Sequence, residues 1–496
     1  MQSHDTPRSG ISISPAVFWL ATLLGHNIAV GQSPPEPMKI GSIVVSGNIR
    51  TRLEGWQWFK GEGDTSYAYS GTLARLSFSR STHKVDWQLE LAAPILLGLP
   101  ANASGPGAQG QFGLGAAYYA ANGAKSNTIF AFPEQGFVRF KSLFGRQTDN
   151  LRIGRFQFAD GAEVSPQDTT LAALKSARIN QRLIGTFAFT HVQRGFYGAQ
   201  FQRDVGTLTV TAVAAFPTRG VFQVDSWGVM KTAFAYAAVT RQVARAKQSA
   251  EWRLFGIYYD DWRAVLKADN RPLAVRQGDL GSIGIATVGG HVLHTVRTSV
   301  GTTDLVGWGA LQAGRWGSQA QRAASFDVEA GYQPKILRRV GPWIRAGCTS
   351  GSGDGDRTDG THGTFFQMLP TPRLFTLFPI SNMMNNRDAF AILILRPSPR
   401  LTIKHESHWL RLASSNDLWY AGGGAFQPWT FGFSGRPSGG STALANVYDI
   451  NADYVLNPHT TATAYWGFAA GKAVIGDVYP QGRNGSFGFL ELNVRF

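Results

Sequence analysis

Short segments in which apolar and polar residues alternate recur along most of the chain. In residues 85–91 the odd-numbered positions are all apolar and the even-numbered positions all polar, and residues 49–54, 207–212, 326–330 and 448–454 alternate similarly. Successive side chains of a strand point to opposite faces, so each segment is predicted to be a strand with one apolar and one polar face. A soluble sandwich and a membrane barrel both produce this pattern, because a barrel turns its apolar face to lipid and its polar face to the lumen.

The end of the chain follows the same rule. Leu490, Leu492 and Val494 alternate with polar residues, and Phe496 is the last residue. A final strand with a terminal aromatic resembles the end of a bacterial outer-membrane β-barrel, whose last strand closes the barrel and is bound by the assembly machinery. The edge strand of a soluble sheet is the alternative.

The composition favours many strands joined by turns. The 496 residues include 58 glycines and 12% aromatics, only 16% are charged, and no linker separates globular halves. Beyond the N-terminal region no apolar run reaches the roughly 18 residues that a spanning helix needs. A chain of this kind can cross a membrane only as a closed barrel, because an open sheet edge would leave backbone groups unpaired in lipid. At roughly 25 residues for each strand and its connection, about 16 to 20 strands are expected, in an even number.

Predicted loops, one predicted helix and clusters of aromatic residues lie between the predicted strands or at their ends. Residues 100–127 and 432–444 are rich in small and polar residues and are predicted to be external loops, whereas residues 169–182 have helical spacing and are predicted to be a short helix or a constricting loop. Aromatic residues gather near segment ends, as in the interfacial girdles of a barrel. These are Trp56, Trp58, Phe59, Tyr258, Tyr259, Trp262, Trp419 and Tyr420.

The N-terminus has the features of a secretory signal peptide. Arg8 precedes an apolar stretch over residues 11–30, and Ala29-Val30-Gly31 offers small residues for cleavage. Residues 1–31 are therefore predicted to be a signal peptide, 32–47 a flexible mature start, and 48–496 the barrel. A retained anchor helix is the alternative.

The charge balance indicates a polyanionic partner. With 47 Lys and Arg against 32 Asp and Glu, the net charge is +15, which suits nucleic acid, anionic lipid or an acidic polysaccharide. The guanidinium group of arginine can donate two parallel hydrogen bonds to a carboxylate. Nucleic acid is not expected, because the basic residues are dispersed along strands and a leader peptide sends the chain out of the cytoplasm.

One region carries a resemblance to a known family. Residues 347–359 form a Ser-Gly-Asp-like acidic loop, a Thr-Phe…Pro segment follows at 364–370, and Asp417-Leu418-Trp419-Tyr420 comes later. In this order they resemble the alginate export family of outer-membrane porins. Residues 50–54 look like the family's first strand, and 145–147, 182–185 and 194–198 like its arginine-bearing middle strands. Two departures are the missing Ser and Asp within 194–198 and Pro372-Arg373 in place of a common histidine.

The resemblance implies an all-β, single-chain antiparallel barrel of about 18 strands, with long extracellular loops and short periplasmic turns, in the bacterial outer membrane. It also implies a passive channel, with no catalytic residues and no cofactor, that conducts an anionic polyuronate outward. The expected partners are the anionic polysaccharide or solute, outer-membrane lipid and lipopolysaccharide, the barrel-assembly machinery through Phe496, and periplasmic partners of an export pathway.

A polyuronate bears a carboxylate on every sugar, so its conduit needs repeated weak attraction along a wall that focuses the field. Glu54, Asp86, Glu90, Asp327 and Glu329 are expected to be counter-charges that hold guanidinium groups in place. The candidate substrate-binding residues of the lumen are Arg50, Arg52, Glu54, Arg139, Lys141, Arg146, Arg152, Arg155, Arg178, Arg182, Arg194 and Arg345.

Other functions find less support in the sequence. Asp354, Asp356 and Asp359 are a weak calcium candidate, because they lack the full ligand run and terminal Glu of a known calcium loop. No nucleophile elbow, phosphate-binding loop or dinucleotide fingerprint is recognisable. The alternatives kept open are a general or uptake porin for small anionic carboxylates and an outer-membrane hydrolase that uses loop carboxylates.

Overall fold

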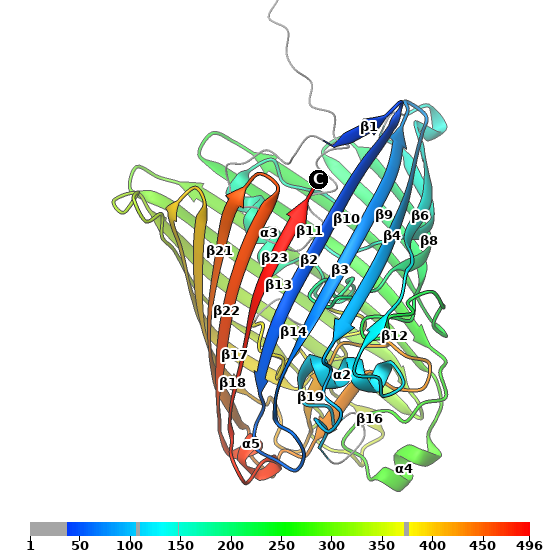
Figure 1. Ribbon diagram of the computed structural model, residues 1–496, viewed down its shortest axis with the longest axis vertical. Helices are drawn as coiled ribbons and strands as arrows, with labels where there is room; N and C mark the ends of the chain where they lie inside the picture. Colours follow the sequence, from blue (N-terminus) through cyan, green and yellow to red (C-terminus); the bar gives the residue numbers. More distant parts are fainter. Residues whose placement is uncertain (1–36, 106–109, 147, 372–375) are drawn as a thin grey trace, which may run out of the picture.

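The protein is a single sheet that closes on itself (Figure 1). The computed structural model describes residues 37–105, 110–146, 148–371 and 376–496. Its barrel has 18 strands, each antiparallel to its neighbours. The last strand, β23 (Asn484–Arg495), pairs with β2 (Ile43–Gln57) from Asn48 opposite Arg495 to Gln57 opposite Ser486. The predicted all-β antiparallel barrel of about 18 strands is therefore confirmed.

The other barrel strands follow in chain order around the ring. They are β3 (Ser66–Ser81), β4 (Val85–Leu97), β6 (Phe132–Lys141), β7 (Asn150–Phe156), β8 (Phe196–Val205), β9 (Leu208–Pro217), β10 (Thr232–Ala244), β11 (Gln248–Asp261), β12 (Ile283–Arg297), β13 (Gly301–Trp316), β14 (Gln319–Pro334), β15 (Trp343–Gly351), β17 (Asn386–Ser398), β18 (Leu401–Arg411), β21 (Ala443–Asn457) and β22 (Thr460–Gly471).

Shorter elements lie at the rims and inside. They are the strands β1 (Met38–Ile40), β5 (Thr128–Ile129) and β16 (Thr361–His362), a separate hairpin of β19 (Trp419–Gly422) and β20 (Phe433–Arg436), the helices α2 (Gly113–Ala121), α3 (Thr169–Arg178), α4 (Leu273–Gly278) and α5 (Ala473–Val478), and the 3-10 turn η1 (Leu143–Gly145). Among the residues with a described position, no helix is both long and apolar enough to span a bilayer.

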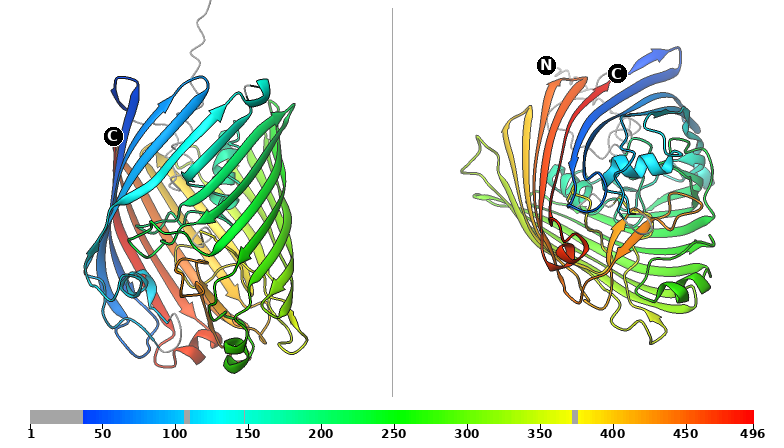
Figure 2. Two further views of the ribbon diagram at one scale, coloured as in Figure 1. Left: turned by 90° about the vertical axis from the view of Figure 1, so that its right-hand side faces the viewer. Right: turned by 60° about the horizontal axis from the view of Figure 1, so that its bottom comes forward.

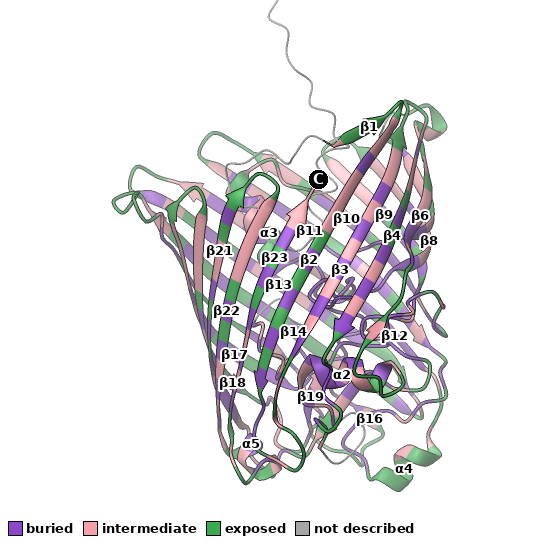
Figure 3. Cartoon of the chain, in the orientation of Figure 1, coloured by how far each residue is buried: buried purple, intermediate pink, exposed green. Residues whose placement is uncertain are grey.

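The alternation of the sequence becomes an outer and an inner face. In β23, Leu490 is 63% exposed whereas Glu491 is 4% exposed, and Figure 3 shows the same banding of buried and exposed residues along neighbouring strands. In β2, Ile49 and Leu53 point outward while Arg50 and Arg52 are buried. An apolar exterior around a polar interior is the reverse of a soluble protein and fits a barrel surrounded by lipid.

The two rims differ in the length of their connections. At one rim the turns are short, such as residues 206–207 between β8 and β9, 399–400 between β17 and β18, and 458–459 between β21 and β22, and the C-terminus lies there (Figure 1). Gly206 adopts a φ of 61°, which a two-residue hairpin turn favours. At the other rim the connections are long, and we call these the short-turn rim and the long-loop rim.

Several long connections fold into the barrel (Figure 2). The largest, residues 157–195 between β7 and β8, is named the inner loop here, and its residues from Arg178 to Arg194 are all buried. It contains α3, which confirms the helix or constricting loop predicted over 169–182. Asp168 caps this helix by accepting a hydrogen bond from the Leu171 backbone N–H at 2.9 Å.

The beginning of the chain differs from the prediction. Residues 1–36, which include the predicted signal peptide and part of the predicted flexible start, lie outside the described residues. Residues 38–47 are not flexible coil, because β1 pairs with β2, and β2 begins at Ile43 rather than 48. The apolar Ile43-Val44-Val45 run allows this, since Val44 and Val45 pair with β3.

Two groups of residues were placed in the wrong elements. Arg182 and Arg194 belong to the inner loop and not to middle strands, because a strand connection with internal hydrogen-bond partners need not cross the membrane. Six of the eight predicted girdle aromatics are buried inside, and only Tyr258 and Trp262 are exposed on the outside. The inward-facing aromatics are Trp56, Trp58, Phe59, Tyr259, Trp419 and Tyr420.

Candidate functional site

The wall of β2 carries two of the predicted arginines, and both are already engaged. The Arg52 Nε and Nη2 atoms donate to Glu491 Oε2 at 2.8 and 2.6 Å, and Nη1 donates to Glu54 Oε1 at 3.1 Å. The guanidinium group also lies 3.9 Å from the centre of the Phe189 ring. Two carboxylates therefore surround Arg52, and it is neutralised within the wall.

Arg50 hydrogen bonds to backbone and also forms a longer ion pair with Glu491. Its Nη1 donates to the Ala188 carbonyl oxygen at 2.8 Å and its Nη2 to the Thr190 carbonyl oxygen at 2.5 Å, while Glu491 is 3.7 Å away. Both carbonyls belong to the inner loop. Arg50 thus fixes the inner loop to the wall formed by β2.

The far wall holds the other part of the inner loop through ion pairs. Arg178 Nε donates to Glu329 Oε1 at 2.7 Å, and Arg182 pairs with Asp327. Arg345 of β15 donates to Glu329 Oε2 at 2.6 Å and also pairs with Asp304. Of the expected counter-charges, Asp327 and Glu329 lie here on β14. These buried pairs hold loop and barrel together, and breaking one would leave a charge without compensation.

Arg194 joins three connections at one point. Its Nη1 donates to the carbonyl oxygens of Gly185 and Leu369 at 3.1 and 2.9 Å, and its Nη2 donates to those of Gly423 and Ala425 at 2.8 and 3.2 Å. The inner loop, residues 352–385 and the β19–β20 connection meet at this guanidinium group. We call it the carbonyl clasp.

A second arginine with this role was not among the predicted residues. Arg263 is held by Asp261 and donates to the carbonyl oxygens of Gln427, Thr430 and Phe431 at 2.8, 2.6 and 3.1 Å. It lies just after β11, outside any alternating segment, so strand periodicity gave no sign of it. In the sequence, the position of Arg263 two residues after Asp261 was the feature that could have indicated it.

Arg155 and Arg146 have two different surroundings. Arg155 is buried, pairs with Glu134 at 3.4 Å and donates to the Ser226 carbonyl oxygen at 3.1 Å. Arg146 lies in the exposed turn between β6 and β7 at the short-turn rim and is not a residue of the lumen wall. The sequence motif around it is a turn, because Asp149 N donates to the Arg146 carbonyl oxygen at 3.1 Å.

Excess positive charge lies on the wall formed by β4, β6 and β7. Arg139 and Lys141 share one carboxylate, Asp86, whose Oδ1 lies 2.7 Å from Lys141 Nζ. Arg152 stands directly opposite Arg139 in the β6–β7 register, an arrangement of like charges that is unfavourable unless something compensates it. We call Arg139, Lys141 and Arg152 the basic patch.

No carboxylate compensates Arg152 among the residues whose positions are described. It donates to the side chain of Gln200 and to the Gln157 carbonyl oxygen, and it lies over the rings of Phe137 and Phe156 at 5.2 and 4.3 Å. Hydrogen bonds to neutral groups hold this guanidinium group in position without cancelling its charge. The basic patch therefore carries three cations against one carboxylate.

Arg75 was not predicted and belongs with this wall. It faces inward on β3 and is 7% exposed, and within the described part of the chain no residue forms an ion pair with it. Glu90, one of the expected counter-charges, accepts a hydrogen bond from Gln135 at 3.2 Å instead. The alternation of β3 gave a signal for Arg75, since the residues on either side of it are apolar.

The acidic loop after β15 folds on itself. Asp354 accepts a hydrogen bond from the Asp356 backbone N–H at 3.1 Å, and Asp359 accepts one from the Thr361 backbone N–H at 2.7 Å. Asp417 accepts a hydrogen bond from the Asp354 backbone N–H at 2.9 Å. In the described ranges no group of three or more His, Cys, Asp and Glu side chains is placed to hold a metal ion.

Comparison with known proteins decides the family. The model of the alginate export family matches residues 133–486, which is well over half of the chain. The chain belongs to the alginate export family. This family member is an outer-membrane β-barrel channel of the bacterial outer membrane, so the short-turn rim is periplasmic and the long-loop rim extracellular. No curated protein matches it.

Solved structures show the same fold at low identity. The alginate export protein shares 9% identity and a TM-score of 0.57 with OccAB2 of Acinetobacter baumannii, covering 92% of this chain and 99% of that chain. It shares 10% identity and a TM-score of 0.53 with the outer membrane protein OpdK of Pseudomonas aeruginosa, covering 91% and 98%. OpdK has also been solved with vanillate. These likenesses establish the architecture.

Proposed function

We propose that this channel passively conducts an anionic polyuronate, or a related anionic solute, along an electropositive lumen wall. The observation that carries the proposal is the basic patch, in which Arg139 and Lys141 share the single carboxylate of Asp86 and Arg152 is held by neutral groups. Arg75 adds a further positive charge on the neighbouring strand β3. A carboxylate that passes this wall gains attraction from several partly screened charges rather than from one deep site, which favours both entry and release.

The remaining arginines have a different part in this proposal. Arg50, Arg52, Arg178, Arg182, Arg194 and Arg345 are hydrogen bonded or paired within the protein. They shape the passage by holding the inner loop, and the solute meets mainly the charges that no carboxylate cancels. The protein acts in this proposal as a conduit and carries out no chemistry.

Uptake of small anionic carboxylates is the second candidate. The inner loop and the other folded-in connections occupy much of the lumen, which favours a narrow solute over a thick polymer. OpdK, a protein of the same architecture, has been solved with vanillate, a small carboxylate. Both candidates require the same basic patch and differ in the size of the solute.

We also infer the partners of this channel and its route to the outer membrane. A signal peptide in residues 1–31 would direct the chain to the periplasm, and the barrel-assembly machinery would bind the final strand through Phe496. Lipid and lipopolysaccharide would surround the apolar exterior. Periplasmic partners of polymer synthesis would supply a polyuronate at the short-turn rim.

The test is single-channel recording in a planar bilayer under a salt gradient, followed by polyuronate oligomers on one side. We expect a reversal potential that indicates anion preference and a current that the oligomers block. Anion preference that resists oligomer block but falls with small carboxylates would favour the second candidate. A cation preference would contradict both.

A hydrolase is tested on the same preparation. Incubating the purified protein with polyuronate and measuring new reducing ends should give no increase over buffer. An increase that follows the protein through purification would contradict a pure conduit.

A further inference from the structure

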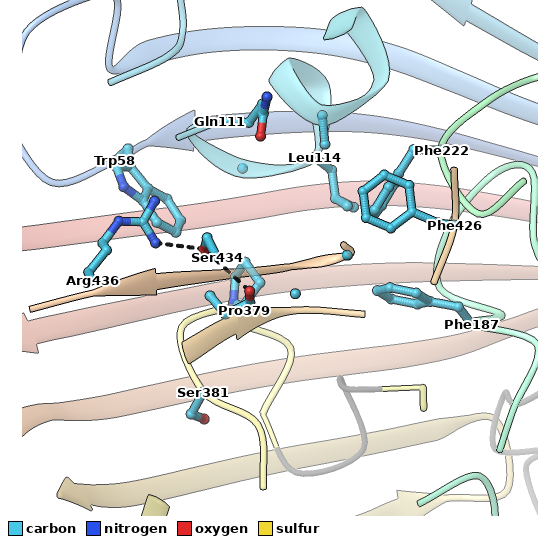
Figure 4. A pocket seen from close by; sticks show the side chains of 15 residues that line it. Trp58, Gln111, Leu114, Phe187, Phe222, Pro379, Ser381, Phe426, Ser434 and Arg436 are labelled. Atoms are coloured by element: carbon cyan, nitrogen blue, oxygen red, sulfur yellow. Dashed lines mark hydrogen bonds between the residues drawn. The ribbon is translucent and has the colours of Figure 1, made fainter. Parts of the chain in front are cut away.

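A cavity opens among the connections of the long-loop rim, away from the basic patch (Figure 4). Its volume is about 120 Å³, which is room for several water molecules or one small organic molecule. Its walls come from the start of α2, the inner loop, the β9–β10 connection, residues 379–381 and the β19–β20 hairpin. None of the residues predicted to bind substrate lines it.

One end of the cavity is polar. Arg436 of β20 lies there beside Ser434 and Trp58, with Arg436 Nη1 donating to Ser434 Oγ at 3.1 Å (Figure 4). The guanidinium group also packs over the Trp419 ring, with its carbon 5.1 Å from the ring centre. Over the described ranges no acidic side chain pairs with Arg436. A positioned guanidinium group with free donors is a receptor for a carboxylate.

The other end is apolar. Phe222 and Phe426 meet edge to face with ring centres 4.8 Å apart, and Phe187 lies 5.7 Å from Phe222. Leu114 of α2 completes this end (Figure 4). In that view the amide side chain of Gln111 lies beside Leu114, whereas Arg436 lies at the far end and no polar side chain is drawn beside the three phenylalanine rings. Such a surface accepts a ring through its apolar face and edge.

We propose that this cavity binds a small monocarboxylate whose ring is apolar, of the benzoate type, with its carboxylate on Arg436 and its ring against Phe222, Phe426 and Leu114. The distribution of polarity decides the class of ligand. A sugar acid would satisfy Arg436 equally well, but its hydroxyl groups would be buried at the apolar end without hydrogen-bond partners, which is costly. An apolar ring leaves no such group unsatisfied.

This site does not depend on the proposed conduction. It lies in the extracellular connections, whereas the basic patch lies on the wall near the periplasmic rim. A bound monocarboxylate there would be captured before the lumen, whichever solute crosses the barrel. Conduction and binding can therefore succeed or fail separately.

The test is isothermal titration calorimetry of the full-length barrel in detergent with benzoate, benzamide and glucuronate. We expect saturable binding of benzoate, and binding of benzamide weaker by about tenfold or more, because a neutral amide loses the charge-assisted hydrogen bonds to Arg436. We expect glucuronate to bind more weakly than benzoate. Equal affinity for benzoate and benzamide, a higher affinity for glucuronate, or no saturable binding would overturn the proposal.

Three variants locate the site. Arg436→Gln should reduce benzoate affinity to the level of benzamide while benzamide binding is kept, which also shows that the cavity has folded. Leu114→Trp should fill the apolar end and remove the binding of both. Arg357→Gln, a loss of the same charge from an exposed loop residue, should change neither. Benzoate binding that survives both Arg436→Gln and Leu114→Trp would place the ligand elsewhere and contradict the assignment.

Discussion

A lumen arginine attracts a passing anion only to the extent that no neighbouring carboxylate cancels its positive charge. Arg52 and Arg152 both face inward, yet Arg52 lies between Glu491 and Glu54, whereas Arg152 is held by the side chain of Gln200 and a backbone carbonyl. The field in the lumen should therefore come mainly from arginines with neutral hydrogen-bond partners. This distinction separates residues that shape the passage from residues that attract the solute.

Replacing Arg152 with Gln should weaken anion selectivity. A unit charge about 8 Å from an ion contributes roughly 0.5 kcal/mol in water, so the anion-to-cation permeability ratio should fall by about twofold or more. Reversal potentials measure this ratio directly. Arg241→Gln is the matched control, because Arg241 faces outward on β10 and the same charge is lost. If Arg241→Gln shifts the ratio as much as Arg152→Gln, the basic patch does not set selectivity.

The acidic loop should respond to pH through Asp354. Burial raises the pKa of Asp354 from 3.8 to about 6, and the Asp417 carboxylate adds to this rise against a hydrogen bond from the Asp356 backbone N–H. The Asp354 carboxyl group therefore holds its proton more tightly in the folded loop than in the unfolded loop. The contribution of this carboxyl group to the stability of the loop is therefore fully present below about pH 4 and is lost as the pH rises through about 6.

Hydrogen exchange of residues 352–363, corrected for the intrinsic rate, measures this loop stability. Protection should be greater at about pH 4 than at about pH 7.5, and Asp354→Asn should remove most of the difference. Arg357→Gln, at an exposed position of the same loop, should leave the difference in place. A pH dependence that persists in Asp354→Asn would assign it to another group.

For single residues, the sequence predicted which face of a strand a side chain lies on but not which residue it contacts. Alternation around Arg50, Arg52 and Glu54 correctly placed all three side chains inside the barrel. It could not show that Arg52 would meet Glu491, because 439 residues separate them in the chain. Partners of this kind are fixed only when the first and last strands pair.

Among the elements, the inner loop has the largest effect on the passage. Its attachments include Arg50 on β2, the ion pairs of Arg178 and Arg182 with β14, the ion pair of Lys175 with Glu251 on β11, and the carbonyl clasp at Arg194. Buried donors and acceptors that are satisfied at several points hold a connection in one conformation. The inner loop should accordingly act as a fixed constriction.

Arg194→Ala should release this constriction while the barrel remains closed. Hydrogen bonds from a charged donor contribute about 1.5–3 kcal/mol each and do not add fully, so we expect the packing of the connections to lose about 3–5 kcal/mol. Single-channel conductance should become larger and noisier, and the inner loop should become sensitive to protease. Arg357→Ala is the control. Unchanged conductance and protease resistance in Arg194→Ala would mean that the clasp is dispensable.

The elements also show where prediction from sequence ends. The helix in the inner loop was predictable, because Leu171 and Leu174 have helical spacing. The segment after it was assigned to strands around Arg182 and Arg194, because a motif of arginine, glycine and aromatics is equally compatible with a strand. Arg194 in this segment donates to the carbonyl oxygens of Leu369 and Gly423, which are 175 and 229 residues away in the chain, and no local pattern encodes such contacts.

For the whole molecule, closure depends on the seam between β2 and β23. Beyond the last paired residues, Gly47 and Phe496 exchange backbone hydrogen bonds of 2.9 and 3.1 Å. A Cβ added at Gly47 would lie 2.1 Å from Cζ of Phe496. The absence of a side chain at residue 47 therefore gives the terminal ring its place over the seam.

Two variants distinguish packing of this ring from its recognition by the assembly machinery. Gly47→Val should lower the folded fraction both in detergent refolding, measured by heat-modifiable gel mobility, and in cells, because the added side chain must displace the ring or separate the strand ends. Phe496→Ala should refold in detergent with a loss of about 1 kcal/mol or less, since the ring is 44% exposed. In cells the same variant should reach the outer membrane poorly if, as we propose, the assembly machinery binds this terminal residue. If Phe496→Ala fails equally in detergent and in cells, the terminal aromatic acts through the seam alone, and recognition of the C-terminus must rest on the alternation of β23.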